Sequence, residues 1–235
     1  MITKKENYSH MPIKLILIRH GESDGNVQRK FCGFKDVCLT KKGIWQAERL
    51  AYRLKGLSVD AVYCSDLKRA RHTSEIIFRD RGIDIVTNPK FREMNFGIWE
   101  GYTFEEVKLK YGYGDEFYSW LENINVKISI PQGESLVDLN NRVMTELGKI
   151  LKKHKKVNND ETIAMVCHGG PIRVILCNAL NIELKYMWNI EQYSTALNMI
   201  SYYNHEAFVD LVNDTSHLED WWQNGININE YKRNE

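Results

Sequence analysis

The stretch Lys14-Leu15-Ile16-Leu17-Ile18-Arg19-His20-Gly21-Glu22 decides the fold class, because an apolar run passes directly into charged residues and a glycine. The run that ends at Ile18 suits a strand buried on both faces of a sheet. The segments Ala61–Cys64 and Thr162–Cys167 have the same character, and Ile83–Val86 is a shorter segment of this kind. Buried strands of this type are typical of a parallel sheet that helices cover on both sides.

Helical patterns fall between these strands. Apolar residues recur at helical spacing after Thr40, the predicted N-cap of a helix that reaches about Leu54. Ser65 is predicted to cap the next helix, which reaches about Arg79. Further elements are expected to be helices beginning at Thr103, at Ser135 and shortly before Pro171, and strands at 195–203 and 207–212. The alternation predicts an α/β fold, a three-layer sandwich with a mostly parallel central sheet flanked by helices.

One domain accounts for this pattern. It is predicted to span residues 12–214, with a helical insertion at about 102–132 that interrupts the alternation of strands and helices. Residues 1–11 are predicted to be a flexible tail and residues 215–235 a C-terminal tail. The aromatic residues between Tyr102 and Trp120 leave two roles open, which are packing of the insertion onto the domain and stacking on a substrate.

The charge balance gives no general attraction to nucleic acid or to an anionic membrane. Lys and Arg number 32 against 31 Asp and Glu, which leaves a net charge of +1. No run approaches the roughly 20 apolar residues that cross a bilayer, and residues 1–11 lack the apolar core of a signal peptide. The five cysteines contain no CxxC pair, which indicates buried free thiols rather than a zinc site. These features predict a cytoplasmic protein without nucleic-acid or membrane partners.

Two of the predicted strands end in a histidine that is followed by glycine. Arg19-His20-Gly21 follows the first strand, and His168-Gly169-Gly170 follows the strand that ends at Cys167. Ligands of an open parallel sheet bind at the carboxyl ends of its strands, where Arg69 and Glu93 are also expected. Arginine forks match phosphoryl oxygens, an imidazole is a nucleophile near neutral pH, and a carboxylic acid can protonate a leaving oxygen. The set favours phosphoryl transfer.

The stretch Leu17-Ile18-Arg19-His20-Gly21-Glu22-Ser23 resembles the signature of the histidine phosphatase superfamily, which is also called phosphoglycerate mutase-like. Further blocks of that pattern follow in order, so that the resemblance covers roughly residues 14–175. These blocks are Gly33, Asp36, Leu39-Thr40, Gly43, Ser65–Arg69, Glu93 with Gly97-Ile98-Trp99-Glu100-Gly101, Gly133-Glu134-Ser135 and Cys167-His168-Gly169-Gly170. The resemblance implies a phosphoglycerate mutase-like α/β fold and a metal-independent phosphatase without a cofactor.

The resemblance also implies a role for each site residue. His20 would attack phosphorus and become phosphohistidine. The phosphoryl group would be held by four side chains, Arg19, Asn26, Arg69 and His168. Glu93 would protonate the leaving alcohol and then activate the water that releases phosphate. Ser23 and Gly169 are further candidates for phosphate contacts, with the alternative for Ser23 that it is only a helix N-cap.

The segment after Glu93 indicates which members of the superfamily are most similar. Mutases carry a basic, tyrosine-containing run directly after this glutamate, whereas this chain has Met94-Asn95-Phe96 and then a net-acidic insertion. In this segment the chain is most similar to α-ribazole phosphatases and broad-specificity phosphatases. The expected partner is therefore a small-molecule phosphomonoester, either α-ribazole 5′-phosphate or one of a broad range of esters.

Two alternatives stay open at this point. A mutase would return the phosphoryl group to another oxygen of the substrate, and a non-catalytic regulatory module would keep the phosphate pocket as a docking site. Pure binding needs no proton donor, so the presence of Glu93 disfavours the regulatory module. The motifs do not determine the physiological substrate or the oligomeric state, monomer or homodimer.

Overall fold

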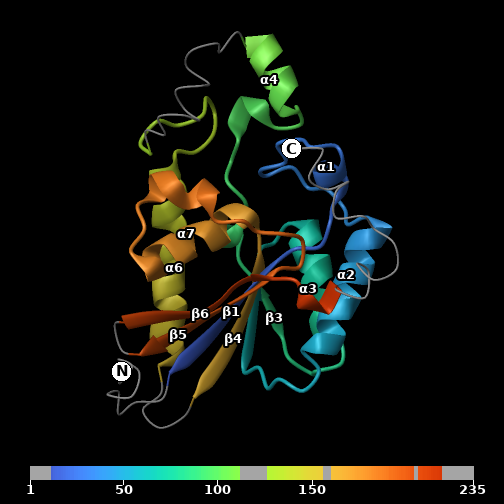
Figure 1. The fold of residues 1–235 in the computed structure, drawn as a ribbon, viewed down its shortest axis with the longest axis vertical. Helices are drawn as coiled ribbons and strands as arrows, with labels where there is room; N and C mark the ends of the chain where they lie inside the picture. The colour runs from blue at the N-terminus through green and yellow to red at the C-terminus, as the bar shows by residue number, and fades with distance from the viewer. Residues whose placement is uncertain (1–11, 112–125, 156–159, 204–205, 219–235) are drawn as a thin grey trace.

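The computed structural model describes residues 12–111, 126–155, 160–203 and 206–218, which build on a central six-stranded sheet (Figure 1). Its strands lie in the order β3-β2-β4-β1-β5-β6. They are β1 (Ile13–Arg19), β2 (Ala61–Cys64), β3 (Ile85–Thr87), β4 (Glu161–Cys167), β5 (Leu197–Tyr203) and β6 (Glu206–Asp214). The first four run parallel to one another, β5 is antiparallel to β1, and β6 is antiparallel to β5. The predicted mostly parallel sheet is confirmed.

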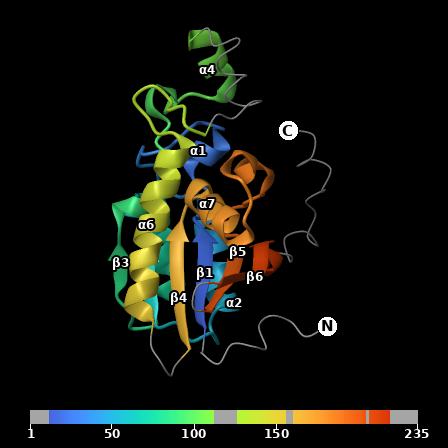
Figure 2. The same cartoon turned by 90° about the vertical axis from the view of Figure 1, so that its left-hand side faces the viewer.

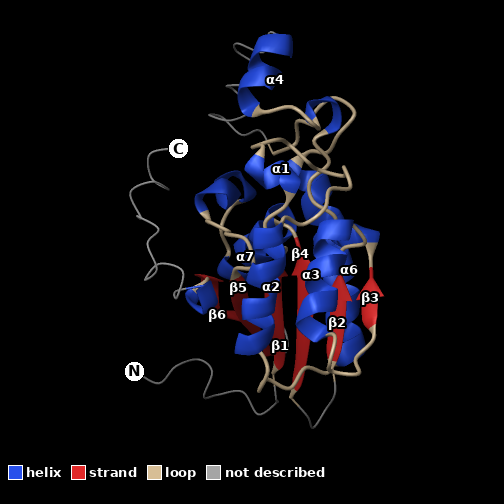
Figure 3. Cartoon of the chain, turned by 90° about the vertical axis from the view of Figure 1, so that its right-hand side faces the viewer, coloured by secondary structure: helices blue, strands red, loops and turns tan. Residues whose placement is uncertain are grey.

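Helices cover both faces of the sheet. The helices α6 (Leu136–His154) and α7 (Gly169–Leu180) lie on one face, as Figure 2 shows, and α2 (Lys41–Arg53) and α3 (Lys68–Phe78) lie on the other, as Figure 3 shows. Each face therefore has its own apolar core, one reaching α6 and α7 and one reaching α2 and α3. This confirms the predicted three-layer sandwich. None of the helices in the described ranges has the length and apolar character needed to span a bilayer.

Capping residues explain where most helices begin. The side chain of Thr40 accepts a hydrogen bond from Gly43 N at 3.0 Å, as predicted for the N-cap of α2. Ser135 and Asp138 form a capping box at the start of α6. The prediction that Ser65 caps α3 is wrong, because α3 begins at Lys68 and its N–H donates to Asp36 Oδ1 at 2.7 Å. A carboxylate from a distant loop thus replaces the local cap.

The predicted insertion lies above the carboxyl ends of the strands, beyond the short helix α1 (Asp24–Val27) (Figure 1, Figure 2). Its described part contains α4 (Phe104–Tyr111), which begins as predicted after Thr103, and Thr103 and Glu106 form a capping box there. Val107 is fully buried in the core cluster of the α6 and α7 face, so this helix is anchored to the domain. Residues 112–125 lie outside the described residues, as do the tail 1–11 and most of the predicted tail 215–235. The domain boundaries and the roles of most insertion aromatics therefore stay predictions.

A buried histidine near the end of the described chain ties the short helix η5 (Ser216–Leu218) to the end of β1. Nε2 of His217 lies 3.0 Å from Thr195 Oγ1, and the N–H of Thr195 donates to the carbonyl oxygens of Arg19 and His20 at 3.1 and 3.3 Å. Arg53 of α2 also contacts the ring, at 3.5 Å from Nδ1. Burial and, secondarily, the charge of Arg53 lower the pKa of His217 to about 4.

Protonation of His217 is expected to make unfolding easier in mild acid. Its pKa is about 4 in the folded chain against 6.5 for a free ring, so the folded ring stays neutral between these values while the unfolded ring takes up a proton. This contribution to stability is present above pH 6.5 and falls by roughly 1 kcal/mol per pH unit below it. Denaturant unfolding of His217→Gln should therefore show a shallower loss of stability with falling pH than the parent chain. The exposed His72, changed to Gln, is the control that should keep the parent slope. Equal slopes in all three proteins would contradict the assignment.

Candidate active site

The strand ends bring the two predicted histidines together. The strands β1 and β4 are neighbours with Arg19 opposite Cys167, so the residues that follow them emerge side by side. The rings of His20 and His168 have centroids 5.1 Å apart in an edge-on arrangement. The chain after β1 passes to α2 on one face and the chain after β4 passes to α7 on the other. Such a switch point opens a crevice at the carboxyl ends of the strands.

A backbone carbonyl fixes the tautomer of His20. Its Nδ1 lies 2.7 Å from the carbonyl oxygen of Gly21, which can only accept, so Nδ1 carries the hydrogen. The lone pair is therefore on Nε2. Burial, followed by the charges of Arg69 and Arg19, lowers the pKa of His20 well below its usual value. The ring is 3% exposed and neutral at physiological pH, which is the form that can act as a nucleophile.

The second histidine is held by Arg69 and Ser65. Nε of Arg69 donates to Nδ1 of His168 at 3.2 Å, so the hydrogen of the neutral ring is on Nε2, where it points to Ser65 Oγ at 2.8 Å. Burial and the charge of Arg69 lower the pKa of His168 well below its usual value. The terminal nitrogens of Arg69 donate to the carbonyl oxygens of Lys35 and Gly33, each at 2.8 Å. Both side chains are buried. Both ring nitrogens of His168 are used within the protein, whereas Arg69 keeps one N–H on each terminal nitrogen.

Arg19 keeps a donor without a partner. Its Nη1 donates to the carbonyl oxygen of Gln192, while Nε is buried and forms no hydrogen bond within the described part of the chain. Burial and the neighbouring charge of Arg173 lower the pKa of Arg19 to about 10, so the guanidinium stays charged at neutral pH. A buried charged donor without an acceptor is costly unless an anion binds there. Arg19 is thus suited to bind an anionic ligand.

The carboxylate of Glu93 is oriented by two backbone N–H groups. Oε1 accepts from Met94 N at 2.8 Å and from Gly170 N at 3.0 Å. Oε2 makes no hydrogen bond with any residue that the structure describes. A side chain at Gly170 would collide with Oε1, which explains the second glycine after His168. The arrangement leaves one oxygen of Glu93 free to exchange a proton.

Asn26, Ser23 and Gly169 lie at the ends of two helices. Oδ1 of Asn26 accepts from the N–H and the hydroxyl of Ser23 at 3.0 and 2.8 Å, so Ser23 is the N-cap of α1. This orientation turns the Nδ2 amide of Asn26 away from Ser23, and it has no hydrogen-bond partner among the described residues. Gly169 is the first residue of α7, where an N–H has no acceptor within the helix. Asn26 and Gly169 therefore both retain a donor, whereas the hydroxyl of Ser23 is used locally.

Comparison with known proteins agrees with this geometry. The model of the histidine phosphatase superfamily, branch 1, matches residues 15–215. The chain belongs to the histidine phosphatase superfamily. The family and the class of enzyme predicted from the sequence are both confirmed.

Proteins similar to this chain are named for different activities. Phosphoserine phosphatase 1 of Hydrogenobacter thermophilus is 30% identical over 210 residues, which cover 89% of this chain and 96% of that protein. Phosphoglycerate mutase-like protein 4 of Arabidopsis thaliana is 34% identical over 213 residues, or 88% of this chain and 87% of that one. The crystal structure of the α-ribazole phosphatase from Shigella flexneri has a TM-score of 0.76 and 26% identity, covering 86% of this chain and 97% of that one.

A residue that the sequence did not reveal, Arg142 of α6, supports the segment that carries Glu93 in this histidine phosphatase. Its guanidinium donates to the carbonyl oxygens of Lys90, Arg92 and Glu93 at 2.7, 2.9 and 2.6 Å. The remaining donors bind both carboxylate oxygens of Glu134, at 2.6 and 2.9 Å. Arg142 therefore uses its full set of donors to position the backbone of Glu93. The opposite charge of Glu134, eight residues earlier in the sequence, could have suggested that Arg142 forms an ion pair. Nothing in the sequence could have indicated its three contacts with carbonyl oxygens.

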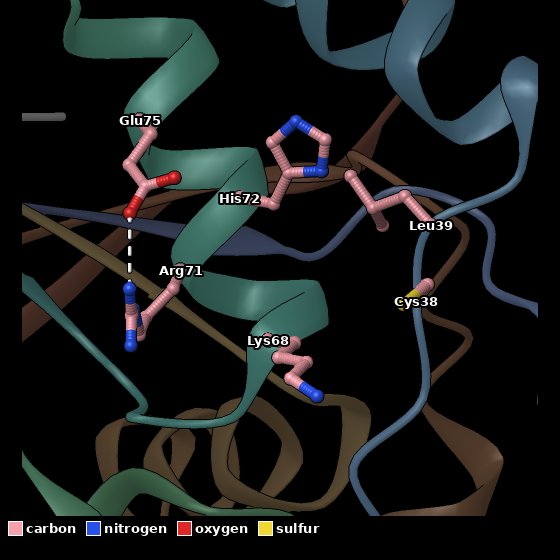
Figure 4. A pocket seen from close by; sticks show the side chains of 6 residues that line it. All are labelled: Cys38, Leu39, Lys68, Arg71, His72 and Glu75. Atoms are coloured by element: carbon pink, nitrogen blue, oxygen red, sulfur yellow. Dashed lines mark hydrogen bonds and ion pairs between the residues drawn. The ribbon is translucent and has the colours of Figure 1, made fainter.

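A separate surface pocket lies on the α3 side of the histidine phosphatase domain (Figure 4). It is lined by Cys38, Leu39, Lys68, Arg71, His72 and Glu75. Arg71 and Glu75 form an exposed ion pair at 3.5 Å, and His72 is exposed. The buried Arg69 does not line this pocket, although it belongs to the same helix. The pocket is therefore distinct from the candidate active site.

Proposed function

We propose that this histidine phosphatase hydrolyses a small-molecule phosphomonoester through a phosphohistidine intermediate on His20. One observation carries the proposal: the hydrogen bond from Nδ1 to the Gly21 carbonyl directs the lone pair to Nε2 of a ring whose pKa is lowered by burial, followed by the charges of Arg69 and Arg19. A neutral imidazole in a fixed tautomer beside the buried Arg69 and the half-buried Arg19 suits attack on an electron-poor phosphorus.

The first step transfers the phosphoryl group to the enzyme. The lone pair of His20 Nε2 forms a bond to phosphorus while the bond from phosphorus to the leaving oxygen breaks. Oε2 of a protonated Glu93 gives its proton to that oxygen, which leaves as an alcohol.

The second step releases inorganic phosphate. Glu93, now a carboxylate, takes a proton from a water molecule whose oxygen attacks phosphorus. The bond between phosphorus and Nε2 breaks, and His20 returns to its neutral form. Because Oε1 is fixed by two N–H groups, the same oxygen Oε2 serves in both steps.

The phosphoryl oxygens are bound by donors that the protein leaves available. These are Nε of Arg19, Nδ2 of Asn26, the N–H of Gly169 and the N–H groups of Arg69 that its carbonyl contacts do not use. His168 would contribute by turning its Nε2–H from Ser65 Oγ to a phosphoryl oxygen. Charged donors in a buried site stabilise the charge of the transition state strongly. We do not include Ser23 among them, since its hydroxyl is committed to Asn26.

Hydrolysis is favoured over isomerisation by the residues after Glu93. Met94 is fully buried and Phe96 is nearly so, so this segment adds no cations to those already at the site, as the basic run of a mutase would. A phosphohistidine that loses its alcohol is then open to water. We further propose that the protein acts in the cytoplasm, on either a phosphorylated hydroxy acid or a riboside phosphate, since its relatives include a phosphoserine phosphatase and an α-ribazole phosphatase.

The experiment measures phosphate release with and without EDTA. The described residues bring together no group of three His, Cys, Asp or Glu side chains that could hold a metal ion, and the mechanism above uses none. Purified protein should release phosphate from phosphomonoesters at an unchanged rate after exhaustive chelation, and should convert 3-phosphoglycerate to 2-phosphoglycerate negligibly. Loss of activity on chelation with recovery on added Mg²⁺ would refute the metal-free reaction. Isomerisation faster than phosphate release would move the protein to the mutases.

A further inference from the structure

A third arginine, Arg173, lies beside the proposed catalytic residues and has no part in the mechanism above. It is one helical turn after Gly169 in α7, so its side chain reaches back over the start of the helix. A methyl group built on Gly169 would lie 2.7 Å from Nη1 of Arg173 and 3.8 Å from Oε2 of Glu93. The guanidinium of Arg173 and Oε2 of Glu93 therefore both lie close to Gly169.

The loop after the short helix η4 (Leu184–Asn189) holds Arg173 next to Arg19. Nε of Arg173 donates to the carbonyl oxygen of Ile190 at 2.7 Å, and Nη1 of Arg19 donates to that of Gln192, two residues further on. The guanidinium of Arg173 also lies over the ring of Trp188, 5.3 Å from its centroid. After burial, the charge of Arg173 does most to lower the pKa of Arg19. Two like charges are thus held near each other by carbonyl groups on one loop.

The terminal nitrogens of Arg173 are not used by the described part of the chain. Nε is its hydrogen-bonding atom there, and no carboxylate among the described residues forms an ion pair with it. Burial lowers the pKa of Arg173, and the charges of Glu93 and Glu191 act against this effect from a distance. Nη1 and Nη2 form a planar fork that matches the two oxygens of one carboxylate.

We propose that Arg173 binds a carboxylate on the alcohol part of the substrate. The inference rests on the proposed function and narrows it to phosphate esters of hydroxy acids. Nη1 of Arg173 and Oε2 of Glu93, which protonates the leaving oxygen, both lie within 4 Å of the same point at Gly169. On this ground the fork is assigned to the leaving-group side of the phosphorus. One guanidinium with Glu93 and Glu191 nearby suits a monoanion better than a dianionic second phosphate. A riboside phosphate has no carboxylate, so Arg173 distinguishes the two substrate classes.

The test compares O-phosphoserine with O-phosphoethanolamine, which differ only by the carboxylate. The parent protein should favour phosphoserine by about tenfold or more in kcat/KM, as expected for a charge-assisted bidentate contact. Arg173→Gln should reduce this ratio by about tenfold, mainly through a higher KM for phosphoserine. Lys185→Gln removes one exposed positive charge from η4 and should keep the parent ratio.

The possible results distinguish a failure of the Arg173 assignment from a failure of the proposed phosphatase function. A parent ratio near one would overturn the carboxylate assignment without any variant, which keeps the test valid even where Arg173→Gln does not fold. An equal loss of both activities in Arg173→Gln would also overturn it, because the arginine would then act on the phosphoryl group. Phosphate release by the parent protein from either ester reports the proposed function separately. Absence of release from both esters and also from a riboside 5′-phosphate would refute that function. Unselective release, or release from the riboside phosphate alone, refutes only the role of Arg173.

Discussion

Replacing His20 by alanine is expected to lower kcat for every phosphomonoester by at least about 10⁴-fold, the size of effect seen when an enzyme loses its nucleophile. The variant retains Arg19, Arg69 and Glu93, so it should still bind substrate or inorganic phosphate. The loss would therefore appear in kcat and not in KM. Initial rates of phosphate release from several esters provide the measurement.

The controls separate lost chemistry from lost structure. The ring of His20 is buried, so thermal unfolding of the alanine variant must show that it remains folded. His72→Ala removes an exposed histidine from α3 and should leave the rates close to those of the parent protein. A folded His20→Ala protein that still hydrolyses esters at a substantial fraction of the parent rate would contradict the role of His20.

The second large effect is expected for Glu93→Gln. The glutamine oxygen can still accept from Met94 N and Gly170 N, so the change removes the proton without removing the contacts that position the group. Hydrolysis of alkyl phosphates, which have poor leaving groups, should slow by about 10²- to 10⁴-fold. Hydrolysis of p-nitrophenyl phosphate should slow much less, because its leaving group needs little protonation.

The comparison of alkyl phosphates with p-nitrophenyl phosphate distinguishes loss of the general acid from loss of phosphoryl binding. The exposed Glu105 of α4, changed to Gln, serves as the matched control and should slow neither class. Equal slowing of both classes in Glu93→Gln would remove the general acid role from Glu93. It would instead indicate an effect on phosphoryl binding.

The sequence predicted the parts of this protein that depend on short stretches of chain. The apolar runs before His20 and His168 predicted two buried strands whose carboxyl ends carry the histidines, and the structure places these strands next to each other. The histidines that the resemblance implied as site residues also lie together at one end of the sheet. They could be predicted because each follows directly on a strand and precedes a glycine, and both are features of a short stretch of sequence.

The contacts between distant segments could not be predicted in this way. Asp36 caps α3 from another loop, and Ser65 contacts His168 across the site. Arg142 reaches across from α6 to the backbone of Glu93, and Arg173 is fixed by the carbonyl of Ile190. Such contacts depend on how the layers pack, and a backbone carbonyl carries no sequence signal.

The most direct test of the mechanism is to trap the phosphorylated enzyme. A substrate with a labelled phosphoryl group, quenched rapidly without acid, should leave label on the protein that is stable to base and labile to acid, as expected for a phosphorus–nitrogen bond. Peptide mapping should place this label on His20, and it should be absent from His20→Ala. Label on another residue, or retention of label by His20→Ala, would contradict the proposed phosphohistidine.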